Sequence, residues 1–262
     1  MLLDRFRLDG KVAVVTGAGR GIGQGCALAF AEVGANVVVA ARTREQVEAT
    51  AEQARGHGVK ALPVVCDVMQ RTDLEALVEA TMQEFGRVDV LVNNAGGTPP
   101  MEALYTSEAM FEEAFRFNVT SAFLLTRLLV PKMLETAGGG SIVNISSAAG
   151  RLVMAGFVAY GTAKAALSFM TRELGREFAP KVRVNAIAVG AVETSALAPF
   201  LDEDLRGKMS ALTPMRRIGT VEDIALGALY LASPASSWVT GKVFEIDGGT
   251  EATNWPFEPP TI

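Results

Sequence analysis

Tyr160 and Lys164 stand four residues apart in the segment "SSAAGRLVMAGFVAYGTAKAA", which runs from Ser146 to Ala166. On a helix this spacing places both side chains on one face. A tyrosine hydroxyl, with a pKa of about 10, is a poor proton donor or acceptor near neutral pH unless its phenolate is stabilised, and a neighbouring ammonium group does this. The two residues are therefore either an ordinary surface pair or an acid–base group.

Two serines, Ser146 and Ser147, precede this pair. A serine hydroxyl can hold a substrate oxygen without bringing a charge of its own. Successive side chains of a strand point to opposite faces, so two adjacent serines at a strand end face different ways. The residues alone leave open which of the two would face the tyrosine.

The elements that must position these residues follow an alternating pattern. Short apolar runs rich in Val and Ile are typical of strands buried on both faces, and helical stretches separate them. The expected strands cover residues 11–17, 36–41, 60–68, 88–96, 141–147, 182–190 and 242–249. The expected helices include residues 23–33, 44–57, 71–85 and 160–178. This order predicts an α/β fold with a doubly wound (Rossmann) parallel sheet of about seven strands.

Domain organisation follows from what the chain lacks. No Pro/Ser-rich linker or block of like charges divides the 262 residues, so we expect a single domain over residues 1–262. The least regular stretch is residues 190–219, which is either a plain surface insertion or a loop that covers a site. The tail "NWPFEPPTI", residues 254–262, is either frayed or docked onto a neighbouring subunit.

Composition excludes several classes of function. The net charge of −5 argues against a nucleic-acid or anionic-membrane partner, since either calls for a basic surface. Cys26 and Cys66, with His57 as the single histidine, suit neither a disulfide framework nor a metal cluster. The charged N-terminus does not resemble a signal peptide, and no apolar run is long enough to span a membrane. We therefore expect a cytoplasmic protein that uses no metal.

A glycine-rich octet, "TGAGRGIG" from Thr16 to Gly23, joins the first expected strand to the first expected helix. In this context backbone N–H groups and a helix N-terminus can cradle a pyrophosphate. Glycines also serve ordinary turns, so the octet is weak evidence by itself. Its spacing is T-G-x-x-x-G-x-G rather than the common G-x-G-x-x-G.

That variant occurs together with "NNAG" (Asn93–Gly96), Y-x-x-x-K (Tyr160–Lys164) and "DGG" (Asp247–Gly249). In this combination the chain resembles the classical short-chain dehydrogenase/reductase family, in the family's order and over essentially its whole length. Within the family the likeness is greatest to hydroxysteroid dehydrogenases and 3-oxoacyl-carrier-protein reductases. The resemblance implies an oxidoreductase that transfers a hydride between a nicotinamide cofactor and a ketone or secondary alcohol, with Tyr160 as the acid–base group.

The resemblance also implies the catalytic set. The family's catalytic serine lies thirteen residues before the tyrosine, which selects Ser147 over Ser146. Lys164 would stabilise the Tyr160 phenolate and bind the nicotinamide ribose. Asn118, in the helical pattern "FRFNVTSAF", would hold a water in a proton relay; a bond to a backbone carbonyl is the alternative for this residue.

Cofactor contacts are implied at further positions. Asp67 would bond the adenine amine, with a helix N-cap as its alternative role. Where the family has Pro-Gly after the sixth strand, this chain has Val189-Gly190, so the φ angle at the first residue of that turn is not fixed by a proline ring. The full set of cofactor-binding residues implied is Gly17, Gly19, Arg20, Gly21, Ile22, Gly23, Arg42, Asp67, Val68, Asn93, Ala95, Gly96, Tyr160, Lys164, Gly190, Val192 and Thr194.

Charge at the end of the second expected strand bears on the choice of cofactor. An NAD-binding fold usually carries a carboxylate there for the ribose 2′-hydroxyl, but this chain has Ala41 followed by Arg42. Arg42 and Arg20 can pair with the 2′-phosphate of NADP(H), which a carboxylate would repel. NADP(H) is therefore favoured, and NAD(H) is the alternative if both arginines are solvated and Glu45 binds the ribose.

The segments expected to line the substrate pocket are residues 96–104, 151–157 and 190–219, and they are mostly apolar. This favours a hydrophobic, steroid-like or 3-oxoacyl-like ketone or alcohol. The candidate walls are Met101, Leu152, Val153, Met154, Phe157, Leu197 and Phe200. A non-catalytic dinucleotide-binding protein, a carrier-protein reductase and an epimerase or dehydratase on the same fold are the alternatives. By resemblance, we expect a homo-oligomer, usually a tetramer.

Overall fold

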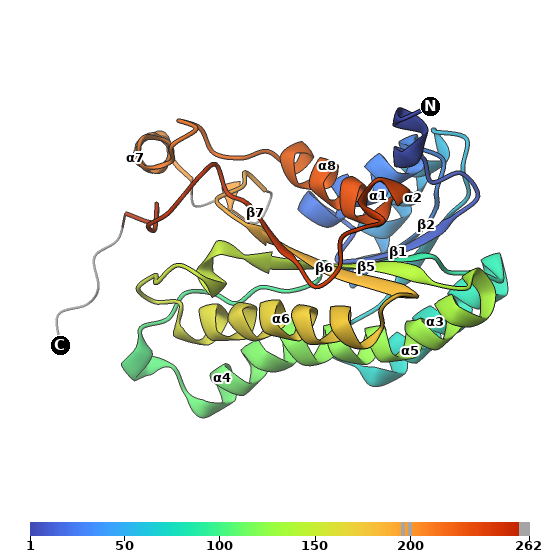
Figure 1. Cartoon of the computed structure of the whole chain (residues 1–262). Coiled ribbons are helices and arrows are strands. Elements are labelled where there is room, and N and C mark those ends of the chain that lie inside the picture. The colour runs from blue at the N-terminus through green and yellow to red at the C-terminus, as the bar shows by residue number, and fades with distance from the viewer. Residues whose placement is uncertain (195–196, 199–200, 257–262) are drawn as a thin grey trace.

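The computed structural model describes residues 1–194, 197–198 and 201–256, and Phe200 therefore lies outside the described residues. Its centre is a parallel sheet of seven strands in the order β3-β2-β1-β4-β5-β6-β7 (Figure 1). The strands are β1 (Val12–Thr16), β2 (Asn36–Ala41), β3 (Ala61–Val65), β4 (Val90–Asn93), β5 (Gly140–Ser147), β6 (Val182–Val189) and β7 (Val243–Ile246). The predicted doubly wound sheet is confirmed.

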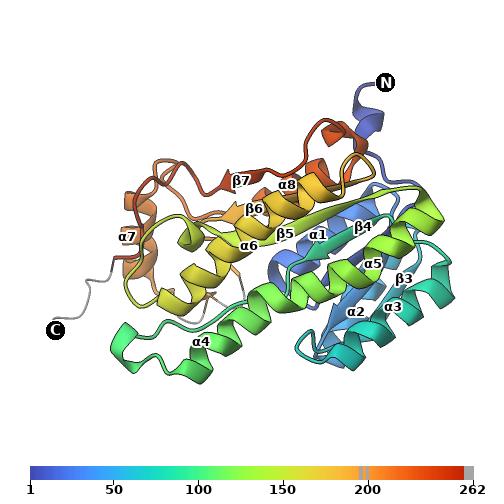
Figure 2. The same cartoon turned by 60° about the horizontal axis from the view of Figure 1, so that its bottom comes forward.

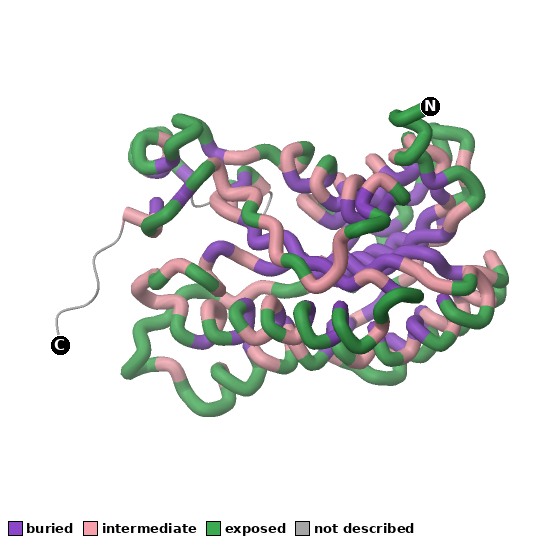
Figure 3. The backbone as a smooth tube through the Cα atoms, in the orientation of Figure 1, coloured by how far each residue is buried: buried purple, intermediate pink, exposed green. Residues whose placement is uncertain are grey.

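Helices cover both faces of the sheet, with α1, α2 and α8 on one side and α3 to α6 on the other (Figures 1 and 2). Their bounds are α1 (Gly21–Glu32), α2 (Arg44–Arg55), α3 (Arg71–Phe85), α4 (Glu108–Phe115), α5 (Ser121–Ala137), α6 (Val158–Glu177) and α8 (Val221–Ala232). Because side chains alternate along a strand, Ala13 and Val15 pack in one core while Val12 and Val14 pack in the other. The inner strands β1, β2, β4, β5 and β6 are accordingly the most buried part of the chain (Figure 3).

The direction of winding reverses between β1 and β4. Strands β1, β2 and β3 follow one another outward, whereas β4 pairs with the opposite edge of β1, with Val15 beside Val92. Ligands of open α/β sheets bind where such a reversal opens a crevice at the carboxyl ends of the strands. The loops after β1 and β4 carry the glycine octet and the "NNAG" segment, so the topology brings these two motifs together.

The helices begin close to the predicted positions, with one addition. α3 spans Arg71–Phe85 as predicted, and it ends where Gly86 takes a left-handed conformation. Between α4 and α5 the chain forms a π-helical turn, Arg116–Thr120, so that the three segments make one continuous helix. Such turns insert an extra residue and are frequent at functional sites. Asn118 lies in this turn.

The irregular stretch after β6 contains a further helix, α7 (Glu203–Leu212), whose first turn is capped by Asp202 through the N–H of Leu205 at 2.7 Å. Leu201, Met209 and Ile218 form a small apolar cluster there, separate from the two cores of the sheet. This stretch therefore has its own packing instead of being an open loop. No helix in the described ranges is both long and apolar enough to cross a membrane.

Candidate active site

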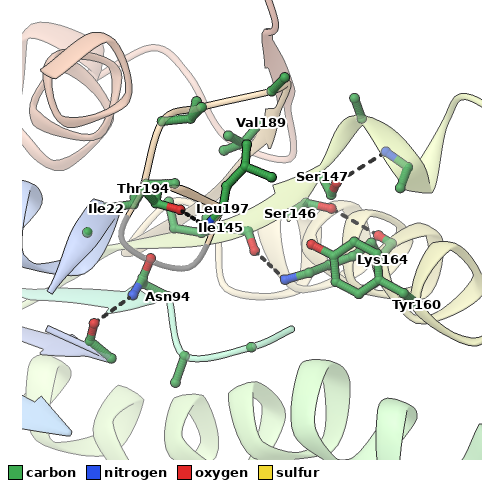
Figure 4. Close-up of a pocket in the computed structure, with 18 of the residues that line it drawn as sticks. Ile22, Asn94, Ile145, Ser146, Ser147, Tyr160, Lys164, Val189, Thr194 and Leu197 are labelled. Atoms are coloured by element: carbon green, nitrogen blue, oxygen red, sulfur yellow. Dashed lines mark hydrogen bonds between the residues drawn. The ribbon is translucent and has the colours of Figure 1, made fainter. Parts of the chain in front are cut away.

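A cavity of about 730 Å³ opens at the carboxyl ends of the strands. The loops after β1 to β6 contribute to it, together with α6, α7 and the chain beyond β7. Figure 4 shows residues from these separate segments turned toward one space. The cavity has two regions, one along the glycine loop and the ends of β2 and β3, the other between β5, α6 and α7.

The glycine loop forms the floor of the first region, with Gly17, Gly19, Arg20, Gly21 and Ile22 lining it. Gly17 has a φ of 62°, and a Cβ atom there would lie 2.7 Å from the side-chain nitrogen of Asn94. Only glycine fits that position. Gly23 has a different role, because a Cβ atom there would lie 2.4 Å from the carbonyl oxygen of Gly17. Gly23 packs α1 against the loop and does not line the cavity.

Asn93 is a correction to the expected cofactor contacts. It ends β4 with its side chain in the core, where Nδ2 donates to Asn144 Oδ1 at 2.9 Å and to Thr126 Oγ1 at 3.2 Å. The next residue, Asn94, faces the other way and lines the cavity, and its Nδ2 donates to the Thr16 carbonyl at 2.9 Å. Asn94 therefore braces the glycine loop. Strand alternation around "NNAG" was the signal that could have separated the two residues.

Positive charge gathers at the outer end of the first region. Arg20 and Arg42 are exposed and line the cavity, and neither has an ion-pair partner within the described chain. Thr43 and Gln46, which the sequence reasoning missed, line the same end. Glu45 does not line it.

Asp67 and Val68 line the cavity at the end of β3, as does Cys66. Asp67 is not a helix N-cap, because α3 begins four residues later at Arg71. Its Oδ1 accepts from the N–H of Met69 at 3.0 Å, which fixes the turn after β3. Burial raises the pKa of the Cys66 thiol to about 12, so this neighbour stays uncharged.

Tyr160, Ser147 and Lys164 meet in the second region (Figure 4). Burial raises the pKa of Tyr160, and a hydrogen bond with the Ser147 side chain acts in the opposite direction. The Lys164 ammonium group is buried 5.7 Å from the centre of the Tyr160 ring and donates to the Ile145 carbonyl at 2.8 Å. The tyrosine hydroxyl is thus a protonated group beside a cation and a second hydroxyl.

Ser146 points away from Tyr160. Its Oγ donates to the Lys164 carbonyl at 3.0 Å and lies 2.8 Å from Ser168 Oγ, so it ties the end of β5 to α6 (Figure 4). Both serines border the cavity, but only Ser147 acts on the pKa of Tyr160, which it lowers. Ser146 therefore holds the turn of α6 that carries Lys164.

Asn118 is buried behind Gly96 and does not line the cavity. Its Oδ1 accepts from the N–H of Gly97 at 2.8 Å, and its Nδ2 donates to the Ala114 carbonyl at 2.9 Å. A Cβ atom on Gly96 would lie 2.7 Å from Asn118 Oδ1 and 3.1 Å from Lys164 Nζ. Asn118 therefore makes the backbone bond named as its alternative, and only the missing side chain of Gly96 separates it from Lys164.

The residues after β6 lie opposite this group. Val189, Gly190, Val192 and Thr194 all line the cavity, as do Ala95 and Gly96 across from them. Gly190 approaches the chain after β7 closely, since a Cβ atom there would lie 2.5 Å from the Cα of Asp247. Val189 stays in register with Ile246 of β7, which holds the turn in place without the family's proline.

The walls of the second region differ in part from the predicted set. Leu152, Met154, Phe157 and Leu197 line the cavity. Met101 does not, and the Val153 side chain is 93% exposed. Arg151 also turns away, with its guanidinium ion-paired to Glu245, Asp247 and Glu251, each at 3.1 Å.

Part of the C-terminal tail lies in this cavity. Thr250, Thr253, Asn254 and Trp255 line it together with Met209 of α7. The described part of the tail, residues 254–256, therefore packs against its own chain, and Phe257 lies outside the described residues. The size and apolar character of Trp255 indicated that it packs against the protein, but no periodic pattern in the sequence indicated where.

The burial of Lys164 predicts a pH dependence. Loss of water around the ammonium lowers its pKa from 10.5 to about 8, so Lys164 loses its charge as the pH rises through that value. We expect kcat/KM for the dinucleotide, which reports on the free protein, to be level below pH 8 and to fall about tenfold per pH unit above it. A profile that stays level to pH 10 would contradict this assignment.

Comparison with known proteins agrees with the fold and the motifs. A family model described as "Enoyl-(Acyl carrier protein) reductase" matches residues 17–251. The chain is 49% identical to an uncharacterized oxidoreductase of Mycobacterium tuberculosis, over the full length of both. It is 40% identical to the 7α-hydroxysteroid dehydrogenase of Escherichia coli strain K12, over 94% of this chain and 96% of that protein.

A solved structure of a 7α-hydroxysteroid dehydrogenase, complexed with NADH and 7-oxo glycochenodeoxycholic acid, superposes with a TM-score of 0.91. It shares 39% identity and covers 94% of this chain and 96% of its own. The sheet order and the site define a doubly wound α/β protein of the dinucleotide-binding class. With these matches, the chain belongs to the short-chain dehydrogenase/reductase family, a family of oxidoreductases.

Proposed function

We propose that this protein is an NADP(H)-dependent dehydrogenase/reductase that interconverts a hydrophobic ketone and the corresponding secondary alcohol. One observation carries the proposal: Tyr160, Ser147 and Lys164 meet in the same cavity whose other region is lined by the glycine loop. A non-catalytic dinucleotide-binding protein would have no use for a buried ammonium placed beside a tyrosine, since burying a charge is costly.

The residues present fit a dinucleotide. A cavity of about 730 Å³ is within the size range of small-molecule and cofactor sites. The glycine loop leads directly into the N-terminus of α1, where backbone N–H groups can hold a pyrophosphate. Asp67, which lines the dinucleotide region, would hold the adenine amine, and Lys164 with Thr194 would hold the nicotinamide half.

The chemistry divides between the cofactor and the chain. A bound nicotinamide supplies a hydride to the carbonyl carbon, or accepts one from the alcohol carbon in reverse. Tyr160 donates its hydroxyl proton to the oxygen that gains negative charge, and Ser147 holds that oxygen with a second hydroxyl. The Lys164 ammonium stabilises the phenolate that remains, which lowers the cost of the proton transfer.

Direct assay tests the function. We propose following nicotinamide absorbance with NADPH and with NADH, using steroid, acyl-thioester and simple ketones. Turnover of ketones supports the proposal, and selective turnover of acyl thioesters would favour the carrier-protein reductase named as the alternative. No oxidation of either cofactor across the panel would favour the non-catalytic binding protein.

The cofactor preference rests on charge. The relative described above was solved with NADH, whereas Arg20 and Arg42 are exposed, line this cavity and have no carboxylate partner among the described residues. We expect Arg42→Asp to lower kcat/KM for NADPH by about 10- to 100-fold and to raise that for NADH, because the introduced carboxylate repels a 2′-phosphate.

The matched control for Arg42→Asp is Arg44→Asp, which changes the charge equally. Arg44 does not line the cavity, and its guanidinium lies 3.5 Å from Glu48. The ratio of kcat/KM for the two cofactors measures the effect. An unchanged ratio in Arg42→Asp, or the same shift in Arg44→Asp, would refute the charge argument.

The homotetramer and the cytoplasmic location are inferred from the family resemblance and the composition. Native mass spectrometry of the purified chain measures the first directly.

A further inference from the structure

Trp255 of the C-terminal tail is linked to Tyr160 through one intervening aromatic ring. Its ring meets that of Phe157 edge-on, with centroids 5.6 Å apart and an angle of 86° between the planes. Phe157 in turn lies 6.1 Å from the Tyr160 ring. All three rings line the cavity. An aromatic row therefore runs from the proton donor to the tail.

Hydrogen bonds hold the tail in this place. Asn254 is buried, and its Nδ2 donates to Thr213 Oγ1 at 2.9 Å. Thr213 Oγ1 donates to the Met209 carbonyl at 2.8 Å, at the end of α7. Trp255 packs against the α7 cluster of Leu201, Met209 and Ile218. The tail and α7 thus form one wall, and the ring of Trp255 extends it to Phe157.

Among the described residues that line this region, Lys164 is the single charged one. The described lining residues that bear charge are Arg20, Arg42, Asp67 and Lys164, and the first three lie in the dinucleotide region. The nearby Arg206 does not supply a free cation, because its guanidinium is bonded to Glu193 at 2.7 Å. Arg151 is likewise occupied by carboxylates. A ligand that enters between Trp255 and Tyr160 therefore meets apolar and neutral polar groups.

We propose that Trp255, with Phe157, determines specificity by forming an aromatic wall that binds the uncharged ring system of a cyclic ketone. The inference rests on the proposed function and names its substrate class. Two ring contacts separate Trp255 from Tyr160, so a short acyclic ketone reaches Tyr160 without touching Trp255, whereas a fused-ring ketone spans both. Aromatic side chains bind such rings through large apolar contact and offset or edge-on packing.

Steady-state kinetics with NADPH tests the proposal on the full chain. We expect Trp255→Ala to raise KM for a bicyclic ketone such as decalone by about 10- to 100-fold and to leave kcat/KM for acetone within about twofold. Trp255→Phe, which keeps an aromatic ring, should have a KM for decalone close to that of the wild type. The Kd for NADPH stays unchanged in both variants. An equal loss for both ketones, or no loss for decalone, would overturn the proposal.

Fluorescence provides a second test that needs no turnover. The chain has two tryptophans, and Trp238 is 99% exposed, so Trp238→Phe leaves Trp255 as the single indole. We expect decalone, added with NADPH or NADP⁺ present, to change the emission of Trp238→Phe and acetone to leave it unchanged. Trp255→Phe, which retains Trp238, is the control and shows no change with either ketone. Emission of Trp238→Phe that does not respond to decalone would overturn the inference, even if the protein reduces simple ketones.

The two proposals fail in different ways. If the wild-type chain reduces no ketone but decalone still changes the Trp255 emission, the proposed function fails and the aromatic wall stands. If acetone is reduced and neither KM for decalone nor the emission depends on Trp255, the proposed function stands and the wall is wrong.

Discussion

Replacing Tyr160 by phenylalanine is expected to lower kcat for ketone reduction by about three to four orders of magnitude, the upper part of the range for loss of a general acid. The variant loses one oxygen atom and keeps the ring that packs against Phe157 at 6.1 Å. Without the hydroxyl, the oxygen that gains charge has no proton donor of suitable strength, and Ser147 alone supplies only a hydrogen bond. Burial raises the pKa of Tyr160, so the hydroxyl carries its proton near neutral pH, and the Lys164 ammonium must stabilise the phenolate for that proton to be donated.

The measurement for Tyr160→Phe is kcat together with the Kd for NADPH. We expect the Kd to change little, because removal of the hydroxyl leaves the glycine loop and Arg42 intact. Tyr105→Phe is the matched control, since Tyr105 is 71% exposed and loses the same atom outside the cavity. A Tyr160→Phe variant with a substantial fraction of wild-type turnover would remove Tyr160 from the mechanism.

The two serines provide the second large effect, and each is the control for the other. We expect Ser147→Ala to lower kcat by about 10²- to 10³-fold, as loss of one preorganised donor to a developing oxyanion does. Ser146→Ala removes the bonds to the Lys164 carbonyl and to Ser168, so its main cost is about 1 kcal/mol of unfolding free energy. Its kcat should stay within a few-fold of wild type, since it does not touch the substrate oxygen.

Comparing kcat with the urea unfolding midpoint separates the two serines. Ser147→Ala should lose activity and lower its midpoint less than Ser146→Ala, since its Oγ accepts one backbone bond, from the N–H of Ala149 at 3.2 Å. Ser146→Ala loses two buried bonds and should keep most of its activity. The reverse assignment of the two effects would mean that Ser146 holds the substrate oxygen.

Much of the architecture was predictable because its signals are local. Buried parallel strands are continuous apolar runs, and the pattern of seven such runs between helices leaves few topologies. Tyr160 and Lys164 likewise lie one turn apart, as their spacing predicts, because both belong to the regular helix α6. The sequence therefore predicts the relative positions of residues well where they lie on one regular helix or strand.

Asn93 could have been separated from Asn94 by strand alternation, and the other errors fall where a segment has no fixed period or where position depends on contacts distant in sequence. Val153 sits between two cavity-lining neighbours, Leu152 and Met154, but its side chain turns outward in an irregular segment without a fixed period. The place of Trp255 depends on the bond between Asn254 and Thr213, residues 41 positions apart. No periodicity in the chain encodes such a pairing, so the fold had to be known first.

The separate packing of α7 affects how a substrate can enter. The Leu201, Met209 and Ile218 cluster shares no buried member with the two cores that flank the sheet. Local opening of a segment costs only the contacts that the segment itself makes, which is far less than global unfolding. We therefore expect α7 to move together with Asn254 and Trp255, which are bonded to it or packed against it, while the sheet, the glycine loop and the side chains of Tyr160 and Ser147 keep their places. Substrate then enters at the expense of the contacts of this small unit and not of the cores that hold the site.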